Sequence, residues 1–186
     1  MPVSESIKRA GRILRHGGIV AYPTEGVFGL GCLPDNAAAV SRILAIKQRD
    51  PSQGLILIAS NVAQLDDWID LPDAADKLTS SSESPVTWIV PPAPHLPYWV
   101  RGEHAGVAVR ITTHPLAAAL CDAAGSALIS TSANRSGRAP ARNRYVLRRL
   151  FRDLVDCIVP GPCGSATAPS EIRDLSSGAI LRSAKS

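Results

Sequence analysis

VAVRITTHPLAAALCDAAGSALISTSAN, residues 107–134, contains the pattern that indicates the fold class. Val107 to Ile111 is a short apolar run of the kind that forms a buried strand. His114-Pro115 then opens a helix with proline at its first position, and this helix is expected to run to about Ala124. Ala127 to Ser130 is a second strand, followed by a long polar loop to Asn143. The segment therefore predicts one strand–helix–strand unit.

The same alternation of elements continues on both sides of this unit. Strands alternating with helices predict a layered α/β or α+β domain with a mixed β-sheet flanked by helices. The glycines at 26, 29 and 31 are interpreted as tight-turn residues. Before this unit we expect a helix capped by Ser4 and ending near His16, a strand at 19–22, a helix capped by Asp35 and ending near Lys47, a strand at 55–59, short helices within 62–78 and a strand at 86–90. After it we expect a helix with its apolar stripe at Leu147, Leu150, Phe151 and Leu154, and then strands at 171–175 and 180–182.

Composition places the chain among globular proteins. Of 186 residues, 45% are apolar and 19% charged, which excludes wholesale disorder. The longest apolar run, Leu55 to Ala59, is far shorter than the ~20 residues of a membrane-spanning helix, and no signal peptide is visible, so we expect a cytosolic protein without a membrane partner. The four cysteines and four histidines are dispersed, which supports neither a disulfide framework nor a metal site.

Three cationic side chains could bind an anionic ligand. Lys47 and Arg49 fall at the end of a predicted helix, where they either interact with the helix dipole or face a polyphosphate. Arg110 interrupts an otherwise buried strand, and a buried guanidinium without an anionic partner costs several kcal/mol. Arg110 therefore meets either an internal carboxylate or a ligand.

Two uncharged segments complete the candidate site. Ser130-Thr131-Ser132-Ala133-Asn134 concentrates small hydroxyl and amide groups, which serve either as local caps or as a cradle for phosphate or ribose. Ala21-Tyr22-Pro23-Thr24-Glu25-Gly26 spans the end of a predicted buried strand and the turn and polar residues that follow it at once. Ligands in layered sheets bind where strand ends and loops open a crevice. A P-loop and a dinucleotide fingerprint are absent, so ATP would need another arrangement.

Eight short segments, in their order along the chain, resemble the YrdC-like threonylcarbamoyl-AMP synthase family in its short form. They are AYPTEGVFGLGC (21–32), KQR (47–49), GLILIA (54–59), PVTW (85–88), VAVRITTHP (107–115), STSANRSG (130–137), PSEIRD (169–174) and ILR (180–182). The resemblance implies a single twisted, mixed-sheet domain over residues 4–182 with a large basic concavity. It also implies that ATP, L-threonine and bicarbonate give threonylcarbamoyl-AMP and pyrophosphate, with Mg²⁺ expected beside ATP.

The resemblance also implies partners and site residues. Downstream transferase proteins would pass the threonylcarbamoyl group to adenosine 37 of tRNA, and tRNA itself is a candidate partner. The residues carried over are Lys47 and Arg49 at the catalytic centre; Arg49, Gln53, Ser132, Asn134 and Arg182 on ATP; Thr24, Arg110, Ser130 and Ser170 on threonine; and Thr87 as a further candidate.

Four departures from the family pattern affect the expected contacts. Gly26 stands where a second threonine is frequent, Gln53 replaces an Asn or Lys near the phosphates, and Ile58 replaces a histidine of longer members. Ser82-Glu83-Ser84 replaces a Trp-Pro-Gly segment. None of these changes touches Lys47, the arginines, Ser132 or Asn134.

Two alternative functions remain open at this stage. Residues 135–152 contain seven arginines and no acid, which also fits an RNA-binding module without catalysis. Aromatic residues for stacking bases are scarce there, which disfavours single-strand recognition. A related carbamoyl-adenylate chemistry occurs within larger hydrogenase-maturation proteins, whose additional domains do not appear in this sequence.

Overall fold

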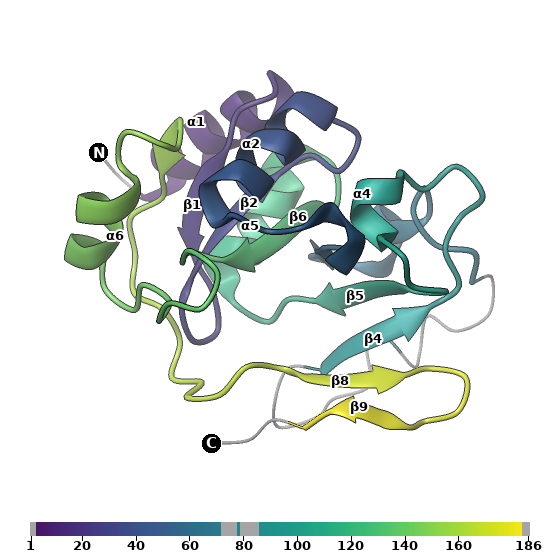
Figure 1. Cartoon of the computed structure of the whole chain (residues 1–186). Coiled ribbons are helices and arrows are strands. Elements are labelled where there is room, and N and C mark those ends of the chain that lie inside the picture. The colour runs from purple at the N-terminus through teal and green to yellow at the C-terminus, as the bar shows by residue number, and fades with distance from the viewer. Residues whose placement is uncertain (1–2, 72–77, 79–85, 184–186) are drawn as a thin grey trace.

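A computed structural model of the chain describes residues 3–71, 78 and 86–183. Its strands form one mixed sheet in the order β7-β1-β2-β6-β3-β5-β4-β8-β9 (Figure 1). Pairs β1–β7, β3–β5 and β4–β8 are parallel, and the remaining neighbours are antiparallel. The strands are β1 Val20–Pro23, β2 Phe28–Cys32, β3 Ile56–Ala59, β4 Val86–Val90, β5 Val107–Ile111, β6 Leu128–Ser132, β7 Cys157–Ile158, β8 Glu171–Asp174 and β9 Ile180–Arg182.

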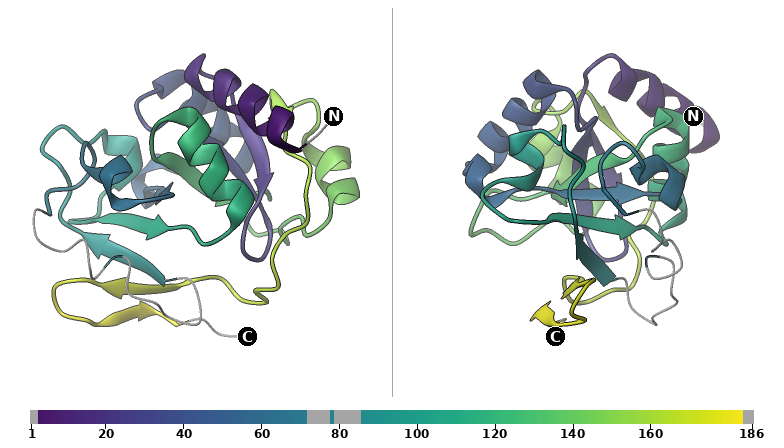
Figure 2. Two further views of the ribbon diagram at one scale, coloured as in Figure 1. Left: turned by 180° about the vertical axis from the view of Figure 1, so that it is seen from behind. Right: turned by 90° about the vertical axis from the view of Figure 1, so that its right-hand side faces the viewer.

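Helices cover both faces of this sheet. One face packs against α1 (Val3–Arg15) and α5 (Pro115–Ala124), which lie side by side when the molecule is seen from behind (Figure 2). The other face packs against α2 (Ala37–Lys47), α4 (Tyr98–Arg101) and α6 (Arg144–Phe151). Two short 3-10 helices, η1 (Pro51–Gln53) and η2 (Val62–Leu65), flank β3.

Side-chain spacing explains how α1 binds the sheet. Ile7, Ala10 and Leu14 recur at helical spacing and are all buried. Gly11, on the same helix, lets α1 approach α5 closely, because an added Cβ would lie 2.6 Å from the carbonyl oxygen of Ala123. The α1–α5 pair therefore depends on a small residue at the crossing.

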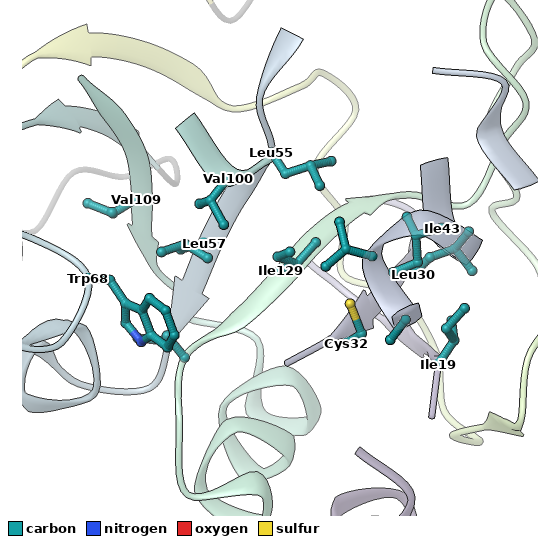
Figure 3. Packing of buried hydrophobic residues seen from close by; sticks show 14 of the residues in the cluster. Ile19, Leu30, Cys32, Ile43, Leu55, Leu57, Trp68, Val100, Val109 and Ile129 are labelled. Atoms are coloured by element: carbon teal, nitrogen blue, oxygen red, sulfur yellow. The ribbon is translucent and has the colours of Figure 1, made fainter. Parts of the chain in front are cut away.

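The larger core lies between the sheet and α2. Leu57, Val109 and Ile129 point from adjacent strands into one apolar layer, joined by Leu30 of β2 and Ile43 of α2 (Figure 3). These side chains alternate with residues that face α1 and α5, as the two-residue period of a strand requires. A rigid, doubly covered sheet results, and it fixes the positions of the polar groups at its strand ends.

Most expected elements are confirmed. The strands β4, β5 and β9 and the helix α5 have the expected bounds, and the strand at 171–175 ends one residue earlier, at Asp174. The helix near the N-terminus already includes Ser4, so Ser4 does not cap it. The cap of α2 is Asn36 rather than Asp35, since the Asn36 side chain accepts a hydrogen bond from the N–H of Ala39 at 2.9 Å.

Other expectations were wrong. Gly29 and Gly31 belong to β2 and not to turns, and β6 continues through Ser132, two residues beyond the expected end. The short elements α4 and β7 were not anticipated. In the stripe of α6, Leu147 and Phe151 are buried, whereas Leu150 is exposed, as is Leu154 just beyond the helix. Part of the predicted 62–78 helices and the Ser82-Glu83-Ser84 departure lie outside the described residues.

Candidate functional site

A cavity of about 1130 Å³ opens between the strand ends and the loops of the sheet. Its lining comes from distant parts of the chain: the loop after β1, the segment after α2, β5, the end of β6, residues 166–170 and the β8–β9 hairpin. Five guanidinium groups and two carboxylates are among the described lining residues: Arg49, Arg101, Arg110, Arg142 and Arg182, with Glu25 and Asp174. The cavity therefore suits a ligand rich in negative charge.

Arg110 projects from β5 into this cavity beside one carboxylate. Its Nη2 lies 3.9 Å from Oε2 of Glu25, and both side chains are only about one-tenth exposed (12% and 11%). The Nε of Arg110 is buried and has no hydrogen-bond partner among the described residues. Both alternatives from the sequence hold together here: Arg110 meets an internal carboxylate and also faces a ligand space.

Glu25 is anchored from the side opposite Arg110. Its Oε1 accepts a 2.6 Å hydrogen bond from the Thr112 hydroxyl and a 3.2 Å bond from the backbone N–H of Thr113. These donors lie just before α5, where the helix dipole favours a negative charge. Burial alone would raise the pKa of Glu25, but Arg110 and the Thr112 hydroxyl outweigh it and lower the pKa below its ordinary value. Glu25 is therefore ionised at neutral pH.

Hydroxyl groups surround the Arg110 end of the cavity. Ser130 is buried on β6, opposite Ile56 of β3 in the antiparallel register. Thr24 is also buried, and its hydroxyl donates to the carbonyl of Val27 at 2.7 Å. The Thr24 hydroxyl is therefore fixed by the backbone, and the strand register fixes the position of Ser130, before any ligand arrives.

Ser170 and Arg182 approach the same region from the C-terminal hairpin. The Ser170 hydroxyl shares a 2.8 Å hydrogen bond with the hydroxyl of Thr87, and its carbonyl accepts a 2.8 Å bond from Nη2 of Arg182. Burial, and then the neighbouring Arg110, lower the pKa of Arg182. Two cations that repel one another while sharing a cavity favour an anion between them.

Arg49 lies beyond the last turn of α2 and lines the same cavity. The left-handed cap residue Gln48 (φ 52°) reverses the chain there, and Nη2 of Arg49 donates to the carbonyls of Gln53 and Gly54 at 3.3 and 2.9 Å. Its Nε is buried and unpartnered among the described residues, and burial lowers the pKa of the group. Arg49 is thus held rigidly with hydrogen-bonding capacity to spare.

Lys47 has a different position from Arg49. It is buried (3% exposed) and does not line the cavity. Its ammonium donates to the carbonyl of Ser132 at 2.6 Å and to the carbonyl and Oδ1 of Asn134, both at 3.0 Å. Burial, with a smaller contribution from Arg49, lowers its pKa to about 8. All three N–H groups are therefore committed to the end of β6.

Asn134 continues this network behind the cavity wall. Its Oδ1 also accepts a 2.6 Å bond from the hydroxyl of Ser132, and its amide donates to the carbonyl of Arg138 at 2.6 Å. Lys47 and Asn134 together fix the hydroxyl-rich segment, whereas Ser132 itself lines the cavity.

Eight of the ten residues predicted for the site line one cavity. They are Thr24, Arg49, Gln53, Arg110, Ser130, Ser132, Ser170 and Arg182; the other two, Lys47 and Asn134, lie behind it. The further candidate Thr87 is buried and does not line the cavity, but it contacts Ser170. Glu25 and Arg142 were not among the predicted contacts. The sequence offered one signal for Glu25, its place next to Thr24 in the loop after a buried strand.

Residues 164–168 form a strap across the loop after β1. The N–H of Gly164 donates to the carbonyl of Thr24 and the N–H of Ala166 to that of Glu25, both at 2.9 Å. Gly26 makes this contact possible, because an added Cβ would lie 2.4 Å from the carbonyl oxygen of Ala166. The space that a side chain at position 26 would need is therefore filled by backbone.

The described residues contain no cluster of three or more His, Cys, Asp or Glu that could hold a metal ion. Cys32 and Cys121 are buried, and burial raises the pKa of each thiol to about 12. Within the described part of the chain, no helix has the length and apolarity needed to cross a bilayer.

Comparison with known proteins gives a consistent set of relatives. A family model for Sua5, YciO and YrdC proteins, described as "Telomere recombination", matches residues 12–184. Threonylcarbamoyl-AMP synthase from Alkalilimnicola ehrlichii is 49% identical over 179 residues, 95% of this chain and 94% of the relative. The enzyme of the same name from Halorhodospira halophila is 50% identical over 178 residues, 95% of this chain and 93% of the relative.

A solved structure extends the likeness to three dimensions. P. abyssi Sua5 complexed with L-threonine superposes with a TM-score of 0.87 at 28% identity. The match covers 96% of this chain and 54% of the longer Sua5 chain. This chain and the matched part of Sua5 therefore share one fold.

Proposed function

The chain belongs to the Sua5/YciO/YrdC family, and from this premise we propose that it is a threonylcarbamoyl-AMP synthase. The observation that carries the proposal is the convergence of Arg49, Arg110 and Ser132, more than 80 residues apart at the extremes, on one cavity. Relatives about half identical over nearly the whole chain bear the same enzyme name. The substrates are then ATP, L-threonine and bicarbonate, and the products are threonylcarbamoyl-AMP and pyrophosphate.

The residues that line the cavity divide the substrates between them. Arg49, Gln53, Ser132 and Arg182 contact ATP, where guanidinium and hydroxyl donors neutralise phosphate charge. Arg110 binds the carboxylate of threonine, with the hydroxyls of Thr24, Ser130 and Ser170 nearby. Asn134 and Lys47 act from behind, by holding the Ser132 segment in place.

The reaction needs positioning more than covalent help from the protein. The threonine amine takes up bicarbonate as a carbamate with loss of water. A carbamate oxygen then attacks the α-phosphorus of ATP in line, and pyrophosphate leaves with the electron pair of the broken P–O bond. The fixed donors of Arg49 and Ser132 would neutralise charge on the phosphates during this displacement.

Mg²⁺ would accompany ATP, but the protein supplies few ligands for it. Of the two described carboxylates in the cavity, Glu25 is bound to Thr112 and faces Arg110, while Asp174 accepts bonds from Ser176 and Ser177 of its own turn. Magnesium commonly binds through phosphate oxygens and water with few protein ligands, and the cavity fits that mode.

Partners follow from the product. An acyl-adenylate must be passed to an acceptor, so downstream transferase proteins that modify adenosine 37 of tRNA are the proposed recipients. Contact with tRNA itself is a second candidate activity, favoured by the exposed Arg144, Arg148 and Arg149 on α6. Salt-sensitive tRNA binding without any ATP turnover would support an RNA-binding module in place of the enzyme.

Pyrophosphate release tests the proposed function. Release should require ATP, L-threonine and bicarbonate together, and the variant Arg110→Ala should raise the KM for threonine by about 10²-fold, since charge-assisted bonds contribute about 1.5–3 kcal/mol each. Arg12→Ala, which removes an exposed guanidinium on α1, is the matched control and should leave the KM unchanged. Turnover that is independent of threonine and bicarbonate would refute the proposal.

A further inference from the structure

The Glu25–Arg110 pair has the features of a receptor for a zwitterion. The two side chains lie at one end of the cavity, carry opposite charges and are separated by 3.9 Å, which is too long for a hydrogen bond. A free amino acid carries an ammonium and a carboxylate on the same carbon atom. We infer that Glu25 binds the amino group of the L-threonine substrate while Arg110 binds its carboxylate, an inference that rests on the proposed function and deepens it.

Both members of the pair have hydrogen-bonding capacity left for a ligand. Oε1 of Glu25 accepts from the hydroxyl of Thr112 and the N–H of Thr113, whereas Oε2 faces Arg110 at 3.9 Å. Across this gap, Nε of Arg110 is buried and has no partner among the described residues. An internal ion pair built only for stability would normally satisfy such a buried donor by direct contact. The gap and the unpaired donor instead leave room for the charged groups of a ligand.

Charge in the rest of the cavity assigns the amino group to Glu25. The other described carboxylate, Asp174, accepts three bonds at Oδ1 from Ser176 and Ser177 of its own turn, and it lies on β8 opposite Ile89, which pairs with Ala108 and not with Arg110. The remaining charged side chains of the described lining are arginines, which repel an ammonium group. Glu25 is therefore the described lining residue that can both accept from an ammonium and stay within reach of a carboxylate held by Arg110.

The same carboxylate separates the two substrates. ATP carries only negative charge near neutral pH, and Glu25 disfavours phosphates at its end of the cavity. Arg49, whose described hydrogen bonds go to the carbonyls of Gln53 and Gly54, offers phosphates a guanidinium without a paired carboxylate. Glu25 therefore favours the amino acid over ATP beside Arg110.

The test compares two ligands that differ only in the amino group. L-Threonine and 3-hydroxybutanoate, which lacks the amine, are titrated by ligand-observed NMR against the wild-type protein and Glu25→Gln. The glutamine keeps the shape and an oxygen for Thr112 but loses the charge. We expect Glu25→Gln to raise the Kd of threonine by at least about tenfold, which is the lower end for loss of a charge-assisted hydrogen bond. The Kd of 3-hydroxybutanoate should stay the same or fall.

Controls separate recognition from folding and from orientation of Arg110. Asp174→Asn removes the other carboxylate of the described lining and should leave the ratio of the two affinities unchanged. Glu25→Asp retains the charge on a shorter side chain and should recover part of the preference for threonine. If the glutamine variant does not fold, Glu25→Asp takes its place in the comparison with wild type.

Each remaining outcome counts against a specific claim. If Glu25→Gln weakens the binding of both ligands equally, Glu25 only orients Arg110. If it does not weaken the binding of threonine, Glu25 makes no contact with the amino group. Either result overturns the inference about Glu25 and leaves the proposed function standing. Failure of the wild-type protein to bind threonine would overturn the proposed function as well.

Discussion

Replacing Lys47 by methionine should weaken folding and catalysis together. Methionine fills similar volume but removes one donor from the carbonyls of Ser132 and Asn134 and from the Oδ1 of Asn134. The Oδ1 keeps the hydroxyl of Ser132 and the Ser132 carbonyl keeps the N–H of Asn134, so the Asn134 carbonyl is the oxygen left without a donor among the described residues. A buried polar group left unsatisfied costs about 1–3 kcal/mol. Removal of the cost of burying an ammonium, together with entry of water near the half-exposed Asn134, offsets part of this loss. We therefore expect Lys47→Met to lower the free energy of unfolding by about 2 kcal/mol.

For a chain of this length, that loss corresponds to a Tm lower by roughly 4–8 °C. Thermal unfolding followed by circular dichroism measures it, and pyrophosphate release at 20 °C measures the effect on turnover. Turnover should fall because Ser132, which lines the cavity, loses its support. If Lys47→Met abolished turnover while its Tm stayed within 2 °C of wild type, Lys47 would act on the ligand directly and the supporting role argued here would be wrong.

Three further variants or conditions probe the same site. Arg49→Ala should reduce kcat for pyrophosphate release by about 10²–10³-fold with little change in Tm, because Arg49 is a preorganised donor whose removal leaves the core intact; an unchanged kcat would remove it from the ATP site. Gly26→Ala should raise the KM for threonine, because the added methyl group displaces the strap at Ala166. The control is Gly125→Ala, at a residue with a φ of +74° and no atom near the added Cβ; it should cost about 1 kcal/mol of stability and leave the KM unchanged. The pKa of Lys47 is about 8 in the folded protein against an ordinary value of 10.5, so between these pH values the unfolded chain binds more protons than the folded one. The unfolding free energy of the wild type, measured by urea titration relative to that of Lys47→Met, should therefore rise as the pH rises through this range. A fall would contradict the lowered pKa.

Local patterns were sufficient for the strands and helices with clear boundaries. Val107–Ile111 and Pro115–Ala124 follow from an apolar run, a proline at the first helical position and a glycine after the last one. The strand Phe28–Cys32 was missed because two of its five residues are glycine, which normally punctuates turns. In the structure Gly31 leaves space for the ring of Tyr22, so the glycines are set by packing across strands, which no local pattern reports.

The site was predictable where a residue's chemistry conflicted with its position. Arg110 stood out because a guanidinium does not belong in a buried strand unless something binds it. Lys47 offered no such signal, since a lysine in the last turn of a helix is ordinary. Its role depends on contacts with Ser132 and Asn134, which lie 85 and 87 residues further along the chain. Only the register of the folded sheet brings those oxygens to its ammonium.

The unpaired atoms of the site explain how it can recognise ligands without a short phosphate-binding motif. A P-loop supplies donors from consecutive backbone N–H groups, so its signature is contiguous in sequence. Here the donors are side chains on separate elements, and two of them, the Nε atoms of Arg49 and Arg110, are buried without partners in the described structure. Keeping such atoms unsatisfied lowers stability, and a sheet with α1 and α5 on one face and α2 on the other can tolerate that cost. Because the cost is already present in the free protein, ligand oxygens that complete these hydrogen bonds gain affinity without first having to order the site.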